Sequence, residues 1–75
     1  MRVWVVEYVN AYRDLYSTAE KAYEAIKTYI EGTYDREYDA EERVRYLTEL
    51  DEEYKDYPEG FGVEDVAWAK AEEVY

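Results

Sequence analysis

The clearest pattern of hydrophobic and polar positions along the chain is an apolar stripe with helical spacing between Ser17 and Gly32. Ser17 and Glu20 have the spacing of a capping box, in which the serine oxygen accepts a hydrogen bond from the Glu20 N–H. Gly32 stands where a left-handed residue commonly ends a helix. The pattern predicts an amphipathic helix over residues 17–32 that needs a sheet or a second helix to pack against. The residues of the stripe are Ala19, Ala22, Tyr23, Ile26, Tyr29 and Ile30.

Two strand patterns precede this helix. Residues 2–9 are rich in β-branched and aromatic side chains, which pleated sheets favour. Their alternation gives two apolar faces, one with Trp4, Val6 and Tyr8 and the other with Val3, Val5 and Val9. Apolar residues on both faces indicate a central strand. Asn10 and Ala11 are suited to a tight turn, so residues 12–16 are expected to return as a second strand.

The second half of the chain contains another helical pattern and a loop. Asp39, with Glu42 three residues later, offers a second N-terminal capping signal. Residues 57–62 carry one proline and two glycines, which break both helix and strand, so we predict a loop there. Between these signals, a helix over residues 40–54 is predicted by the spacing of Ala40, Val44, Leu47, Leu50 and Tyr54.

Residues 63–75 fit two interpretations. As a strand, Val66 and Trp68 share a face. As a helix, Val63, Ala67 and Ala71 belong to one stripe, and alanine favours helix. We favour the strand because a two-stranded hairpin alone is barely stable. The sequence therefore predicts a single α+β domain over residues 1–75, with a three-stranded antiparallel sheet and two helices in the order ββααβ. The alternative has a helical C-terminal segment and the order ββααα.

The first thirty residues, together with about the last ten, resemble a group of known proteins. The strand sequence V-W-V-V-E-Y, followed by a short return strand and L-Y-S-T-A-E-K-A-Y-E-A-I-K-T-Y-I, is similar to small uncharacterised phage and mobile-element proteins. The shared motif is a capped amphipathic helix after a hairpin, so the resemblance implies a fold and assigns no functional residues.

Catalytic side chains are scarce in this sequence. The chain has no histidine and no cysteine, which removes the usual general base, the thiolate nucleophile and the common transition-metal ligands. Ser17 is the only serine, and its position explains it as a helix cap. We therefore expect no enzymatic activity, no cofactor and no metal site.

The charge and the short apolar runs restrict the partners. The longest apolar run, residues 3–6, is too short to span a membrane, and the N-terminus lacks the pattern of a signal peptide, so we expect a cytoplasmic protein. A net charge of −11 argues against direct binding to nucleic acid or to an anionic membrane. It favours a basic protein as partner, or serves solubility alone.

Almost all of the negative charge lies in one block. Residues 31–65 hold 14 acidic and four basic residues, a net charge of −10, whereas residues 1–30 are neutral overall. Glu49 and Glu53 stand one turn apart in the C-terminal half of the predicted second helix, where the helix dipole is negative. Carboxylates in these positions work against the stability of the helix, which makes them candidates for function.

Three interpretations of this acidic block compete. In the first, it is a solvated face that keeps a small protein soluble. In the second, its carboxylates imitate the phosphates of a nucleic acid, since carboxylates one helical turn apart are roughly 5–6 Å from each other. In the third, it belongs to a structural or interaction protein that binds another basic protein, or forms a homodimer through an exposed sheet edge.

The composition of the block resembles that of phage DNA-mimic inhibitors, including anti-CRISPR and anti-restriction proteins. This resemblance implies a small inhibitor that occupies the cationic nucleic-acid-binding site of a host defence protein in the host cytoplasm. We adopt it as the functional hypothesis, with the self-associating or basic-partner protein as the alternative. The predicted contact residues are Glu49, Asp51, Glu52, Glu53 and Asp56, with Tyr54 and Tyr57 beside them.

Overall fold

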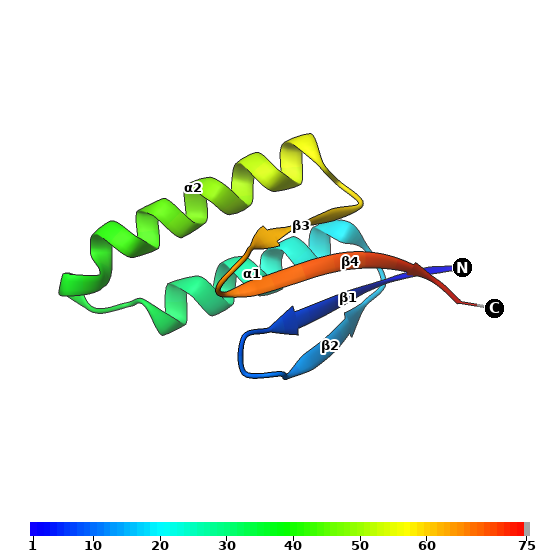
Figure 1. The fold of residues 1–75 in the computed structure, drawn as a ribbon, viewed down its shortest axis with the longest axis horizontal. Helices are drawn as coiled ribbons and strands as arrows, with labels where there is room; N and C mark the ends of the chain where they lie inside the picture. The colour runs from blue at the N-terminus through cyan, green and yellow to red at the C-terminus, as the bar shows by residue number, and fades with distance from the viewer. Residues whose placement is uncertain (75) are drawn as a thin grey trace.

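The computed structural model describes residues 1–74, which form a four-stranded sheet and two long helices (Figure 1). The N-terminus and the end of β4 lie at one end of the molecule, and the connection between the helices lies at the other. In chain order the elements are β1 (Arg2–Tyr8), β2 (Arg13–Tyr16), α1 (Ala19–Thr33), a 3-10 turn η1 (Glu37–Asp39), α2 (Ala40–Asp56), β3 (Gly60–Val63) and β4 (Ala67–Glu73).

The sheet is antiparallel throughout, with the strand order β2-β1-β4-β3. The predicted α+β class is confirmed, as is the central position of β1, which pairs with β2 on one side and β4 on the other. The C-terminal segment is a strand, so the helical alternative is wrong within residues 63–74; Tyr75 lies outside the described residues. The predicted order ββααβ lacks one strand, because the structure has ββααββ.

The missed strand is β3, in a segment predicted as a loop from its proline and glycines. Gly62 has a φ of 154°, a backbone conformation that side-chain-bearing residues rarely adopt. A Cβ at this position would lie 2.3 Å from the carbonyl oxygen of Ala67 and 2.8 Å from the Cα of Trp68. Gly62 therefore permits a close approach between β3 and β4, which is one of the reasons for which glycine occurs inside strands.

Both ends of α1 differ from the prediction. The helix is capped by Thr18, whose hydroxyl accepts from the Lys21 N–H at 3.1 Å, and Ser17 instead lies 3.3 Å from the Lys21 ammonium. The predicted capping box of Ser17 and Glu20 is therefore wrong by one residue. Gly32 does not end the helix, which runs to Thr33 and closes with the Tyr34 N–H bonded to Ile30.

The second helix is longer than predicted at its C-terminus. It runs over Ala40–Asp56, whereas the hydrophobic pattern predicted residues 40–54. Asp39 makes no capping hydrogen bond with its side chain, because it belongs to the 3-10 turn that leads directly into the helix. The two extra residues place Asp56 on the helix itself, next to the Tyr57 cap.

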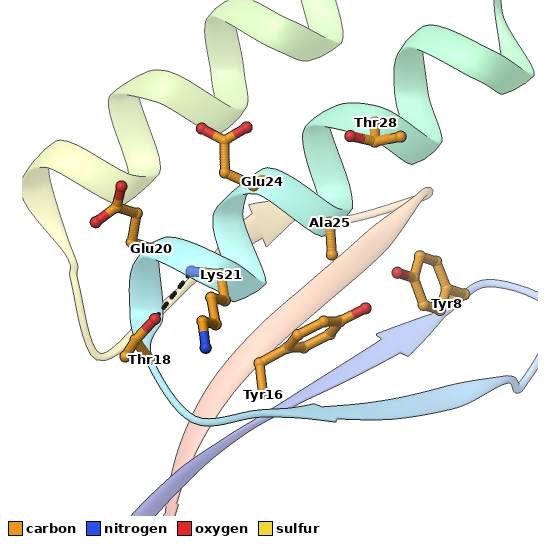
Figure 2. A pocket seen from close by; sticks show the side chains of 8 residues that line it. All are labelled: Tyr8, Tyr16, Thr18, Glu20, Lys21, Glu24, Ala25 and Thr28. Atoms are coloured by element: carbon orange, nitrogen blue, oxygen red, sulfur yellow. Dashed lines mark hydrogen bonds between the residues drawn. The ribbon is translucent and has the colours of Figure 1, made fainter.

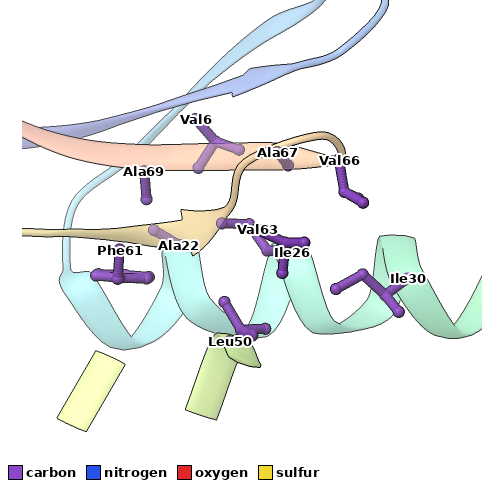
Figure 3. Close-up of a cluster of buried hydrophobic side chains, with 10 residues drawn as sticks. All are labelled: Val6, Ala22, Ile26, Ile30, Leu50, Phe61, Val63, Val66, Ala67 and Ala69. Carbon is purple, nitrogen blue, oxygen red and sulfur yellow. The ribbon is translucent and has the colours of Figure 1, made fainter. Parts of the chain in front are cut away.

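The hydrophobic core lies between the two helices and one face of the sheet (Figure 3). The register places Val6, Ala69 and Phe61 side by side on this face, so β1, β4 and β3 all contribute to it. α1 packs against β1, β2 and β4, and α2 packs against β3 and α1. The buried residues of this cluster are Val6, Ala22, Ile26, Ile30, Leu50, Phe61, Val63, Val66, Ala67 and Ala69.

The two glycines with contrasting surroundings give a paired test of this fold. We expect Gly62→Ala to lower the free energy of unfolding by at least about 2 kcal/mol, because its Cβ meets backbone atoms and its φ is positive. Gly32→Ala should raise it by about 0.5 kcal/mol, since Gly32 is helical and a Cβ there meets nothing within 4 Å. Urea unfolding measures both changes. A Gly32→Ala variant less stable than the wild type would contradict the helical assignment.

Candidate functional site

The structure separates the predicted contact residues into two groups. Glu49, Glu52, Glu53 and Asp56 form pairs three and four residues apart along α2 (Glu49 with Glu52 and Glu53, Asp56 with Glu52 and Glu53), so they share one side of the helix. Three of them are exposed and Glu53 is half-buried. We call these four residues the acidic row. Asp51 lies outside the row, because one residue on a helix corresponds to a rotation of about 100°.

Asp51 is engaged in the contact between the two helices. It accepts a short hydrogen bond from the hydroxyl of Tyr23 on α1. This bond to a carboxylate, together with burial, raises the pKa of Tyr23 to about 12. Asp51 therefore has a structural partner, unlike the carboxylates of the acidic row.

The two predicted tyrosines have different surroundings. The ring of Tyr54 stacks on Tyr23, with centroids 4.6 Å apart, and meets the edge of Phe61 at 4.9 Å. Tyr54 thus packs against the core and is directed away from the acidic row. Tyr57 follows Asp56 directly after α2, its backbone N–H is bonded to the carbonyl of Glu53, and the residue is 62% exposed.

The arginines nearest to the acidic row are engaged elsewhere. Arg43 donates to the backbone carbonyls of Tyr34 and Arg36, which fixes the connection between the helices. The guanidinium of Arg45 lies over the ring of Tyr46, 5.0 Å from its centroid, and donates to the hydroxyl of that residue. These arginines therefore gather near the N-terminal half of α2 and do not neutralise its C-terminal half.

The ion pairs of residues 1–74 all lie away from α2. Arg2 pairs with Glu59 at 3.0 Å and with Glu73 at 3.2 Å, and the N-terminal ammonium is 4.0 Å from Glu73. The remaining pair joins Arg13 and Glu7 across β2 and β1 at 3.6 Å. The acidic row has no cationic partner within the described part of the chain.

At its position on α2, a row of carboxylates without cationic partners lowers the stability of the helix. It occupies the last two turns of α2, where the helix dipole is negative, and Lys55 is the single base of the last turn. Glu53 and Asp56, in the last turn, each cost about 0.3–1 kcal/mol, and the like charges one turn apart, Glu49 with Glu53 and Glu52 with Asp56, add a few tenths. Local stability therefore does not explain why acids stand here, and the row is taken as the first candidate site.

A second candidate site is a groove between α1 and the β1–β2 hairpin, with a volume of about 740 Å³ (Figure 2). Sequence reasoning missed it, although Tyr8 and Tyr16 belong to the inward-facing alternation of β1 and β2. Burial is the main cause that raises the pKa of both tyrosines, and Tyr16 also donates to Asp14 at 3.0 Å. The lining residues are Tyr8, Tyr16, Thr18, Glu20, Lys21, Glu24, Ala25 and Thr28.

The groups around this groove are mixed in chemistry. They supply tyrosine and threonine hydroxyls, two carboxylates and one ammonium, without a histidine or a thiol. Within residues 1–74, no three acidic side chains come together in a way that could hold a metal ion. Over the same residues, neither helix combines the length and the apolar composition that crossing a membrane requires.

The bond between Tyr23 and Asp51 predicts a specific response to pH. The pKa of Tyr23 is raised to about 12 in the folded chain, against about 10 when unfolded. Its contribution to stability is therefore complete below pH 10 and lost as the pH rises through about 12. We expect Tyr23→Phe to lower the free energy of unfolding at pH 7 by about 1 kcal/mol and to flatten the fall in stability between these pH values.

Urea unfolding at a series of pH values measures both effects. Tyr57→Phe is the matched control, since Tyr57 is exposed, and it should change the free energy of unfolding by less than about 0.5 kcal/mol. If the free energy of unfolding fell by the same amount between pH 10 and pH 12 in the two variants, the Tyr23–Asp51 bond would not be what holds the helices together.

Comparison with known proteins gave no relatives: no protein-family model, no curated protein and no solved structure matched this chain. The resemblance to small phage proteins and to DNA-mimic inhibitors therefore stays a prediction. The functional argument rests on the acidic row and its surroundings.

Proposed function

We propose that this chain is a non-enzymatic binding protein that docks the acidic row of α2 onto a cationic nucleic-acid-binding surface of a basic partner protein. The observation that carries the proposal is that Glu49, Glu52, Glu53 and Asp56 share one side of a helix end and have no cationic partner in residues 1–74. A basic surface would supply the missing counter-charges. It would thereby recover the stability that these carboxylates cost the free protein.

The spacing of the row fits the mimicry of a phosphate backbone. From Glu49 to Asp56 the helix rises about 10 Å, so four carboxylates occur at about one per 3.5 Å of axis. One strand of duplex DNA carries a phosphate about every 3.4 Å of axis. A groove lined with lysine and arginine at the spacing of phosphates therefore meets carboxylates at nearly the same linear density.

Tyr57 adds an aromatic anchor at the end of the row. Its backbone N–H closes α2 on the carbonyl of Glu53, which fixes the residue next to the last carboxylates. Its exposed ring can occupy the place where a nucleic-acid base would stack on the partner. Tyrosine is also among the residues that dominate binding energy at interfaces.

In its narrower form, the proposal makes the chain an inhibitor of the anti-CRISPR or anti-restriction type, which acts on a host defence protein in the host cytoplasm. The acidic composition and the hairpin–helix pattern of the first thirty residues support this form. The alternative is an interaction protein that binds a different basic partner or associates with itself. The two are separated by whether nucleic acid competes with the chain for the partner.

The test is capture of partners from a bacterial lysate, followed by competition. A partner held through the row should be released as salt is raised from about 50 mM to about 500 mM, because screening weakens contacts between charges. Duplex DNA should displace the chain from the purified partner in proportion to the concentration of DNA. A partner that binds the chain and DNA at the same time would overturn phosphate mimicry.

Charge reversal of the row should separate binding from stability. We expect the combined variant Glu49→Lys, Glu52→Lys and Glu53→Lys to lose partner binding by at least 100-fold, since three contacts become repulsive. The same variant should unfold at a higher urea concentration, with a gain of about 1 kcal/mol, because lysines suit the C-terminal end of a helix.

The control for this variant carries the same change of net charge at other exposed positions. Glu31→Lys, Asp35→Lys and Glu64→Lys alter exposed residues outside α2 and outside the groove, and should change partner binding by less than about tenfold, through long-range charge alone. Equal losses of binding in the two triple variants would show that net charge, rather than the row, determines recognition.

A further inference from the structure

The face of the sheet opposite the helices carries large exposed apolar side chains between its charged ones. Antiparallel sheets with one covered face commonly alternate apolar residues inward with polar residues outward. Here β1 places Val3 and Val5 on the face without helices, because Trp4 and Val6 point toward the helices, although Val5 itself is only 4% exposed. By its register with Val5, Leu15 of β2 lies on the same face. The central position of β1 protects its edges but does not account for two apolar faces.

We call this surface the open face; its outward residues are Val3, Val5, Glu7, Arg13, Leu15, Trp68, Lys70 and Glu72. Leu15 is 64% exposed and Trp68 is 40% exposed, although both are large apolar side chains. Within it, a shallow hollow of about 170 Å³ is lined by Val5, Glu7, Trp68, Lys70 and Glu72.

The ring of Trp68 lies in tight contact with the position of Gly62 and in ordinary contact with that of Gly60. A Cβ on Gly62 would lie 3.1 Å from the indole Cε3, and a Cβ on Gly60 would lie 3.9 Å from the indole Nε1. The ring of Trp68 therefore extends over β3, where side chains on these two residues would otherwise stand. The sequence keeps β3 free of outward side chains, and the result is a flat aromatic surface beside the hollow.

The charge of the open face differs from that of the rest of the chain. It carries two acids, Glu7 and Glu72, and two bases, Arg13 and Lys70, so it is neutral in a protein with a net charge of −11. Two copies of this chain repel each other through their acidic surfaces. Contact through the open faces brings together neutral surfaces and keeps the two α2 helices on opposite outer sides.

We propose that the open face is a self-association surface, on which a second copy of this chain packs sheet to sheet in a two-fold dimer. With the axis along the strands near β1, the register places Leu15 of each copy over the hollow of the other. The same arrangement brings Arg13 over Glu7 and Trp68 of the second copy, where an ion pair and a cation–π contact are available. This inference does not depend on the proposed function.

Association along a sheet edge is disfavoured by both outer strands. β2 has four residues, and the N–H of Leu15 is occupied by the side chain of Asp14 at 3.0 Å. β3 also has four residues, and α2 packs against it. Short or occupied edge strands are common devices against edge pairing. The edge homodimer that the sequence suggested is therefore less favourable than a dimer through the open face.

The size of the surface predicts a weak and reversible dimer. The seven-residue strands β1 and β4 are about 24 Å long and the four-residue strands β2 and β3 about 14 Å, so four strands about 4.8 Å apart give a footprint of roughly 360 Å² per copy. Stable interfaces bury about 800 Å² per partner, so we expect a dissociation constant on the order of 0.1 mM at low salt. Such a dimer carries one acidic row on each outer side and can therefore bind two basic sites at once.

Sedimentation velocity of the full chain, from about 5 µM to about 500 µM, tests the dimer directly. We expect Leu15→Glu to weaken association by at least tenfold, because each dimer gains two carboxylates in the apolar contact. Val44→Glu is the matched control: Val44 is 61% exposed on α2, and the substitution makes the same change of charge with no effect on the open face. It should leave association within about twofold of the wild type.

Salt gives the sharpest discrimination between this inference and the proposed function. Dimerisation through neutral faces of a strongly acidic protein should strengthen between about 50 mM and about 500 mM salt, because screening reduces the repulsion between copies. Partner binding through the acidic row should weaken over the same range. A chain that stays monomeric at all concentrations, or a dimer that dissociates as salt rises, would overturn the inference and leave the proposed function intact.

Fluorescence supplies a second readout that identifies the face. Trp4→Phe leaves Trp68 as the sole tryptophan, and it removes an indole N–H that is buried without a hydrogen-bond partner. In this variant, the emission of Trp68 should shift to shorter wavelength as the concentration is raised and the ring loses water. A dimer that forms with no change in this emission would place the contact elsewhere and contradict the assignment to the open face.

Discussion

The contact of α1 with the β1–β4 ladder is the interaction on which the rest of the structure depends. Ala22, Ile26 and Ile30 are fully buried on the face of the helix that meets the sheet. Beneath them, β4 presents Ala69, a side chain small enough for a close approach, next to Val6 of β1. A chain of 75 residues can build only one core of this kind. The remaining elements therefore pack against it: β2 pairs with β1, β3 pairs with β4, and α2 contacts β3 and α1.

The sequence predicted the parts of the fold that follow from local pattern, since α1, α2 and the first two strands each carry their own periodicity. It did not predict β3, because Gly60 and Gly62 carry no periodic signal and are usually loop residues. Their role becomes visible only when the ring of Trp68, from a different strand, lies over them. Gly32 is the opposite case: the sequence predicted that it ends α1, but the helix continues to Thr33. The ring of Tyr34, directly after the helix, lies 5.1 Å from the ring of Tyr46 on α2, measured between centroids.

For the candidate site, the sequence identified the acidic residues of α2 but not the side of the helix on which each side chain lies. Leu50 is the buried residue of α2, and its position fixes which way every neighbour points. Counted from Leu50, Asp51 turns toward α1 and Tyr54 turns toward the core, whereas Glu49 and Glu52 turn outward. A count of charges cannot make this distinction, but a helical projection anchored on Leu50 could have separated Asp51 from the acidic row. The groove beside Tyr8 and Tyr16 depends on how α1 packs against the β1–β2 hairpin, and this packing leaves no periodic signal in the sequence.

The distribution of charge follows from the same one-sided core. Because both helices cover one face of the sheet, the acids of α2 are held on one side of the molecule and the open face lies on the other. The few bases are placed where they hold the fold, as Arg2 does at the ends of β1 and β4, and as Arg43 does between the helices. The acidic row is left without counter-charges, and the open face is left without net charge. Under the two proposals, screening by salt acts on these surfaces in opposite directions: it weakens docking of the row on a basic partner and reduces the repulsion between two copies of the chain.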